Sequence, residues 1–156
     1  MSGGTIVVRL ANTAASNQRD YRAAVGTYLV TGGTLQFGDA SSGAAKTFRL
    51  AAFSSTVATV LPNLVISNAS ANHTVQLTTG PSLGLGATLQ TGTTLSLNSL
   101  TLSLMVNLSN AGTLTGTTTS SRLAFVGTRA QTWTGGGAVT APLNDLLVNN
   151  PAGVTL

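Results

Sequence analysis

One phrase of this chain occurs twice, and the repetition limits the folds that the chain can adopt. The stretch Leu61–Leu77, LPNLVISNASANHTVQL, returns in altered form as Leu143–Leu156, LNDLLVNNPAGVTL. Two further pairs of segments keep the same order: Leu35–Phe48 with Leu123–Trp133, and Val57–Asn68 with Val139–Asn150. The offset between copies drifts from about 88 to about 79 residues, which indicates a super-repeat of roughly 80 residues with small gaps. A closed barrel or sandwich would lose its long-range register through such drift, whereas a solenoid tolerates it because each coil contacts only its neighbours.

Short bursts of alternating apolar and polar residues run through the chain, each bounded by Gly, Asn, Ser or Pro. Thr5–Leu10, Asn63–Asn68 and Thr74–Leu77 are examples. This alternation indicates short strands separated by turns. The one stretch that we do not assign to strand is Ala11–Gly26, which we expect to be a loop or a short helical turn. We therefore predict an all-β fold, a right-handed parallel β-helix (β-solenoid) with coils of about 20 residues.

We expect residues 1–156 to form a single β-solenoid segment, with 1–25 as an entry segment and 26–156 as the repeats. The second copy of the phrase stops one strand into the repeat. A solenoid ending there would leave strand edges and apolar interior uncovered. We therefore expect an excerpt of a longer repeat protein, whose C-terminal face meets the next repeat or a second copy of the chain.

The matching phrases also predict which side chains face the interior. Leu64, Ile66, Leu146 and Val148 should point inward at equivalent positions of two separated coils, because NLVIS and DLLVN alternate identically. Two asparagines, at the same point of both copies, should lie at corners with left-handed backbone or in a side-chain ladder. These asparagines are Asn68 and Asn150.

The aromatic residues follow the repeat as well. Trp133 aligns with Phe48, and Phe37 aligns with Phe125. Stacking between rungs inside a solenoid produces this pattern, so we expect an interior role. The alternative is that Trp133 and the two tyrosines stack on sugar rings.

Residues that carry chemistry are few. The acids are Asp20, Asp39 and Asp145, and they do not form the carboxylate pair that a glycoside hydrolase on a β-helix needs. We expect Asp39 to accept N–H groups in a turn beside Gly38. His73 is the only histidine; it lacks partners for a metal site or a triad, and we expect it in a turn, exposed. We predict no catalytic, cofactor-binding or metal-ligating residue, no cofactor and no enzymatic activity.

Charge and hydropathy restrict the partners further. The net charge of +4 comes from seven scattered Lys and Arg against three Asp, and without a cationic stripe we expect no nucleic-acid binding. Only 6% of the residues are charged, against roughly 25% in soluble domains, so Thr, Ser, Asn and Gly must solvate the surface. No window has the length of apolar residues that a membrane-spanning helix needs. The absence of cysteine excludes disulfides.

The stretches PNLVISN, NLSNAGTLTGTTTSSRLAFVGTRAQTWTGGG and LNDLLVNNPAGVTL resemble the repeats of very large cell-surface proteins of Bacteroidota. Those proteins are adhesin-like β-solenoids exported by the type IX secretion system, and the likeness runs from about Gly26 onward. The resemblance implies a bacterial extracellular or cell-surface location. The C-terminal sorting domain of such proteins is not present in this chain.

The leading hypothesis is a structural and adhesive module, part of a stalk or fibre, whose partners are neighbouring repeats or further copies. One rival is a binding module that presents a flat Thr-rich face to polysaccharide or ice, although regular Thr-x-Thr ranks at coil spacing are not apparent. The other rival is a fragment of a β-helix enzyme that degrades polysaccharide, which the shortage of acids disfavours.

Overall fold

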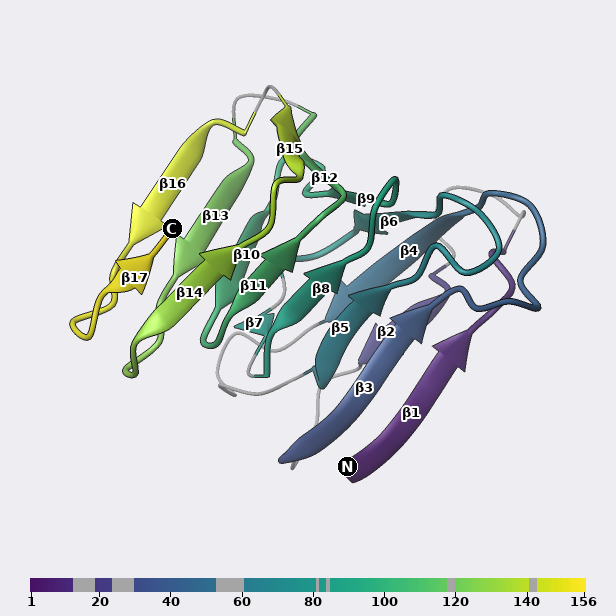
Figure 1. The fold of residues 1–156 in the computed structure, drawn as a ribbon, viewed down its shortest axis with the longest axis horizontal. Coiled ribbons are helices and arrows are strands. Elements are labelled where there is room, and N and C mark those ends of the chain that lie inside the picture. The colour runs from purple at the N-terminus through teal and green to yellow at the C-terminus, as the bar shows by residue number, and fades with distance from the viewer. Residues whose placement is uncertain are drawn as a thin grey trace.

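The computed structural model describes residues 1–12, 19–23, 30–52, 61–80, 82–83, 85–117, 120–140 and 143–156. Its regular elements in these ranges are all strands, and all their pairings are parallel (Figure 1). The chain winds through three sheets as a β-solenoid of about four turns, as predicted.

The three sheets form the walls of the solenoid. Sheet A contains β1 (Ser2–Val8), β3 (Gly32–Phe37), β5 (Asn63–Ile66), β8 (Ala87–Leu89), β11 (Leu108–Asn110), β14 (Gln131–Thr134) and β17 (Val154–Thr155). Sheet B contains β2 (Tyr21–Ala23), β4 (Thr47–Ala52), β6 (Thr74–Leu77), β9 (Thr94–Ser96), β12 (Thr113–Thr115) and β15 (Ala138–Thr140). Sheet C contains β7 (Ser82–Leu83), β10 (Thr101–Leu104), β13 (Arg122–Phe125) and β16 (Asp145–Val148).

From β5 onward, successive strands belong to sheets A, B and C in turn. In Figure 1 sheet A is in front, its strands run upward, and successive coils advance from right to left, which is a right-handed path. Turns lie about 23 residues apart, close to the predicted spacing. The spacing varies between coils, because Thr34 pairs with Asn63 but Thr94 pairs with Thr113. The corners absorb this difference in length, and the strands stay in register.

Alternate side chains of each strand enter one apolar interior. Leu64 and Ile66 of β5 are fully buried, as predicted. Their partners in the neighbouring coil, Leu35 and Phe37 of β3, are also fully buried. Because parallel partners point to the same side of a sheet, each inward position extends along the axis as a column of apolar residues.

The prediction for the second copy is confirmed for the inward direction of the two side chains, but it is wrong in giving them positions equivalent to those of the first copy. Leu146 and Val148 are 43% and 52% exposed, and they lie on sheet C, whereas Leu64 and Ile66 lie on sheet A. They do continue interior columns, since Leu146 pairs with the buried Leu123, and β16 is the last strand of its sheet. Their exposure arises because none of the described residues covers this end.

The two copies of the repeated phrase occupy different walls. The first copy places β3 and β5 on sheet A and the following strands, β4 and β6, on sheet B. The second copy places β13 and β16 on sheet C and the following strands, β14 and β17, on sheet A. A period of roughly 80 residues is not a whole number of turns about 23 residues apart, so the second copy starts on another wall.

Aromatic contacts follow from this arrangement and correct the expected stacking. Phe37 contacts Phe48, with ring centroids 5.3 Å apart, and Phe125 contacts Trp133 at 5.9 Å. Each pair joins two consecutive strands across one corner, and the aligned residues do not stack on one another. Trp133 is partly buried and packs against the core, which agrees with the interior role. Each copy of the repeated sequence therefore forms two consecutive strands joined by a corner, with an aromatic pair in contact across that corner.

The N-terminal residues are part of the sheets. Tyr21–Ala23 forms β2 and pairs with β4, so the assignment of all of Ala11–Gly26 to loop or helical turn is wrong for these residues. Residues 13–18 and 24–26 lie outside the described part of the chain. β1 lies within 1–25 as well and pairs with β3. Pairing with the next coil makes β2 a strand although its own sequence shows little alternation.

Two corner asparagines bind neighbouring coils, Asn68 the following one and Asn150 the preceding one. Asn68 Nδ2 donates to the Thr91 carbonyl at 3.0 Å, and Asn150 Nδ2 donates to the Arg129 carbonyl at 2.8 Å. They lie at corners, as predicted, but on different edges of the solenoid, and neither has positive φ. The non-glycine residues with positive φ in the described ranges are Asn98 and Ser99, in the corner between β9 and β10.

Candidate functional surfaces

His73 lies in the corner between β5 and β6, but it is fully buried, so the expectation of an exposed histidine is wrong. Its ring packs edge-on against Phe48, with centroids 5.4 Å apart. Gly38, with φ of +80°, lies directly against the ring, and a Cβ there would be 2.2 Å from His73 Cδ2. Burial lowers the pKa of His73, and the nearby Lys46 lowers it further. The imidazole is therefore neutral at pH 7.

The hydrogen bonds of His73 decide what its ring can do. The Lys46 backbone N–H donates to Nδ1 at 3.2 Å, so the neutral ring carries its proton on Nε2. Ser70 Oγ lies 3.2 Å from Nε2 and accepts that proton as a hydrogen bond. A histidine that activates a serine must accept the hydroxyl proton instead. This Ser–His pair is arranged for structure and not for nucleophilic catalysis.

The three acids serve turns and ion pairs. Asp39 accepts the Ser41 N–H at 2.9 Å in the corner after β3, as predicted. Arg9 also pairs with Asp39, and this hydrogen bond, with lesser ones from Ser41 and Ser42, holds the pKa of that carboxyl below its ordinary value.

Asp20 accepts the Arg49 N–H at 2.6 Å, and Asp145 pairs with Arg122 at 2.6 Å. The described residues contain no group of three His, Asp or Glu that could hold a metal ion. They also contain no helix long and apolar enough to cross a membrane.

The outer face of sheet B carries a rank of threonines that sequence analysis missed. Successive pairings place Thr47, Thr74, Thr94 and Thr113 side by side across four coils. Unequal spacing along the chain hides this rank, since the intervals are 27, 20 and 19 residues.

The adjacent rank on sheet B is mixed: Arg49, Gln76, Ser96 and Thr115. Long side chains in this second rank make the first coils of the face uneven. Among the described strands of this face, Thr-x-Thr is complete on β12, with Thr113 and Thr115, while β9 has serine in the second rank and β15 has alanine in the first.

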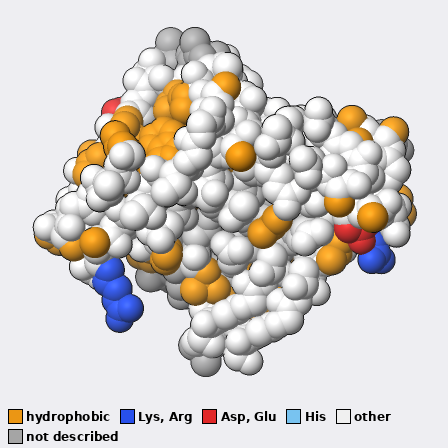
Figure 2. Space-filling view, viewed as in Figure 1, with side chains coloured by type: hydrophobic (Ala, Val, Ile, Leu, Met, Phe, Trp, Pro, Cys, Tyr) orange, Lys and Arg blue, Asp and Glu red, His pale blue; other side chains and the backbone are white. Residues whose placement is uncertain are grey.

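Sheet A carries a groove on its outer face, which faces the viewer in Figure 2. Its polar part, about 270 Å³ in volume, crosses β8, β11 and β14 at the level of Gly86. Gly86 lies between Asn63 and Asn107 in one outward row, and it leaves a notch there because it has no side chain. The same groove presents the side chains of Thr88, Ser109, Thr132 and Thr134.

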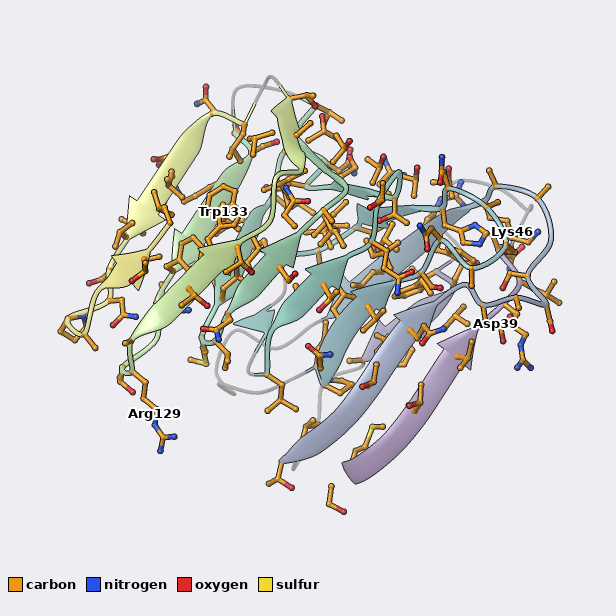
Figure 3. The ribbon with its side chains drawn as sticks, viewed as in Figure 1. Asp39, Lys46, Arg129 and Trp133 are labelled. Carbon is orange, nitrogen blue, oxygen red and sulfur yellow. The ribbon has the colours of Figure 1, made fainter. Side chains whose placement is uncertain are left out.

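An apolar hollow of about 350 Å³ adjoins the polar part at the corner that leads into sheet A. Leu85 and Val106 line both hollows, so the two lie side by side. Met105 and Val126 extend the apolar part, and Arg129 lies at its rim. Figure 3 shows Arg129 projecting away from the body of the molecule at this corner. We refer to the two hollows together as the sheet A groove.

Both ends of the solenoid expose residues of interior columns. At the C-terminal end Val139, Leu146 and Val148 are 45%, 43% and 52% exposed, and orange side chains gather there in Figure 2. At the N-terminal end Ile6, which pairs with the buried Leu35, is 40% exposed. Side chains built for a dry interior are thus in contact with water at both ends of the described structure.

Comparisons of the chain with protein-family models, with curated proteins and with solved structures find no match.

Proposed function

We propose that this chain is a structural and adhesive module of a bacterial extracellular or cell-surface protein. In this proposal it is one segment of a stalk or fibre that extends along the solenoid axis. Each end face packs against the opposite end face of a neighbouring β-solenoid segment, either the next repeat of the same protein or a further copy of this chain.

The observation that carries the proposal is the exposure of interior columns at the C-terminal end. Leu123 and Phe125 are fully buried, whereas their partners one coil later, Leu146 and Val148, are about half exposed. Exposed apolar residues beside unpaired strand edges strongly favour association with another chain or segment. A coil added at this end would bury these side chains and pair β15, β16 and β17.

The N-terminal end supports the same arrangement. β1 is the first strand of sheet A and has a free edge that runs parallel to that of β17. Because every strand of the sheet is parallel, the N-terminal edge of one segment can extend the C-terminal edge of another without reversing direction. Such a head-to-tail contact does not close on itself, so it produces a filament.

The proposal contains no catalytic step. The tautomer of His73 and the engagement of Asp39 in a turn support this part of it. Its support for an adhesive role at a bacterial surface is the resemblance of the repeated phrases to surface β-solenoids.

The test is the mass of the chain in solution, measured by sedimentation velocity from micromolar to millimolar concentration. We expect mass to increase with concentration for the natural chain. The double variant Leu146→Lys/Val148→Lys, and a chain with a capping coil appended after Leu156, should remain monomeric with unchanged β-sheet circular dichroism. Thr94→Lys, on a lateral wall, should behave like the natural chain. A natural chain that stays monomeric at the highest concentration would refute the proposal.

A further inference from the structure

We propose that the sheet A groove binds a carboxylated oligosaccharide, with the sugar chain lying along the solenoid axis and a carboxylate at Arg129. The inference concerns a lateral wall and does not depend on what packs against the end faces.

The notch at Gly86 is a built feature of the backbone. Gly86 has φ of +124°, and a Cβ there would lie 3.0 Å from the Asn107 carbonyl oxygen and 3.4 Å from Asn63 Oδ1. Both the conformation and the space favour glycine at this position. The outward row therefore lacks a side chain at the buried Gly86, and the notch is shallow because Asn63 Oδ1 and the Asn107 carbonyl close in on it.

The amides beside the notch are oriented and available. Asn107 Oδ1 accepts the Thr132 N–H at 2.9 Å, which fixes the side chain and leaves Nδ2 without a partner in the described structure. The side chain of Asn63 makes no hydrogen bond with the described residues. The hydroxyls of Thr88 and Ser109, in the next outward row, form no hydrogen bond with the described residues. Amides and hydroxyls that donate and accept suit the hydroxyl groups of a sugar.

The apolar part of the groove and Arg129 suit the C–H face and the carboxylate of an acidic sugar. Leu85 and Val106 adjoin the polar part, and they can cover the C–H face of a sugar ring or an acyl methyl group. The Arg129 side chain is exposed and forms no ion pair within the described part of the chain. A guanidinium binds a carboxylate through two parallel hydrogen bonds. Arg129 is the one cation among the described residues that line the groove, so selectivity should depend on a single acid group.

Two other classes of ligand fit less well. An extended peptide that adds a strand needs a free sheet edge, but β8 and β11 are paired on both sides. A nucleic acid needs several cations along its backbone, and the groove has Arg129 alone among the described lining residues.

The test is isothermal titration of the whole chain with a galacturonate oligosaccharide and with its fully methyl-esterified form. The acidic form should bind and the ester should bind more weakly. Arg129→Gln should weaken binding of the acid about tenfold and leave binding of the ester unchanged, because it removes a hydrogen bond to a charged group. Asn107→Ala should weaken both ligands, since it removes a contact to the sugar itself.

Arg49→Gln is the matched control, because Arg49 lies on the outer face of sheet B, away from the groove. It should bind both ligands like the natural chain, and circular dichroism should show all three variants folded. If Arg49→Gln weakened binding as much as Arg129→Gln, the attraction would be general to a basic chain and the site would be refuted. Absence of binding at millimolar oligosaccharide, or a preference for a peptide or single-stranded nucleic acid in this groove, would refute it also.

Discussion

Replacing Gln131 by Leu should loosen the C-terminal coils of the solenoid. Gln131 is 1% exposed and its amide makes four hydrogen bonds. Nε2 donates to the carbonyls of Leu104 at 3.1 Å and Val106 at 2.7 Å. Oε1 accepts from the Gly127 N–H at 3.1 Å and from Asn150 Nδ2 at 2.7 Å. These partners belong to three successive coils, so one side chain joins all three.

The size of the effect follows from these bonds. A neutral hydrogen bond contributes about 0.5–1.5 kcal/mol net, and a buried partner left unsatisfied costs about 1–3 kcal/mol. Leucine keeps the volume of the side chain and restores part of the loss through apolar contact. We expect the free energy of unfolding to fall by about 3 kcal/mol.

The assay is hydrogen exchange together with urea unfolding, because a repeat protein can open one coil at a time. Exchange should accelerate in β13, β14, β16 and β17 and stay slow in β5 and β6. Gln36→Leu is the matched control, since the Gln36 amide makes one hydrogen bond, to the Gly38 carbonyl at 2.7 Å, on the outer face. The reasoning is wrong if the two variants lose the same stability, or if exchange at the C-terminal coils does not change.

Three further perturbations test the interior and its corners. Ile66→Asp places a charge in the dry interior and should abolish folding, judged by circular dichroism, whereas Val65→Asp on the outer face should fold. Burial lowers the pKa of His73 in the folded chain, so the unfolded chain binds the proton more readily. The contribution of the neutral His73 to the free energy of unfolding is therefore complete above pH about 6.5, the ordinary pKa of histidine. It is lost as the pH falls through the lowered pKa of the folded chain. The melting temperature should therefore drop between pH 7.5 and 5, and a profile independent of pH would contradict the burial of His73. Gly38→Ala should cost clearly more than Gly43→Ala in thermal melts, because both have positive φ but only Gly38 lies against a ring, and equal losses would show that the contact with His73 is not tight.

The alternation of apolar residues was sufficient to predict strands and the inward positions of Leu64 and Ile66. Period-2 alternation is a local property, because successive side chains of a strand point to opposite faces whatever the strand pairs with. The drifting repeat was sufficient to predict a solenoid, since only contacts between neighbouring coils tolerate it. The turn role of Asp39 was also local, because its carboxylate binds N–H groups two residues away.

Only the tertiary structure decided which wall each strand joins and which outward residues become neighbours. Coil length varies from 19 residues between Thr94 and Thr113 to 30 between Ser2 and Gly32, and each difference shifts the positions of the strands that follow. This is why the repeated phrase moves to another wall, why the threonine rank is hidden and why the notch at Gly86 could not be found from spacing. Burial also depends on what lies one coil away. His73, a polar corner residue, is enclosed because Gly38 in the neighbouring coil allows close approach. Val148 continues an interior column but is exposed, because no described coil covers it.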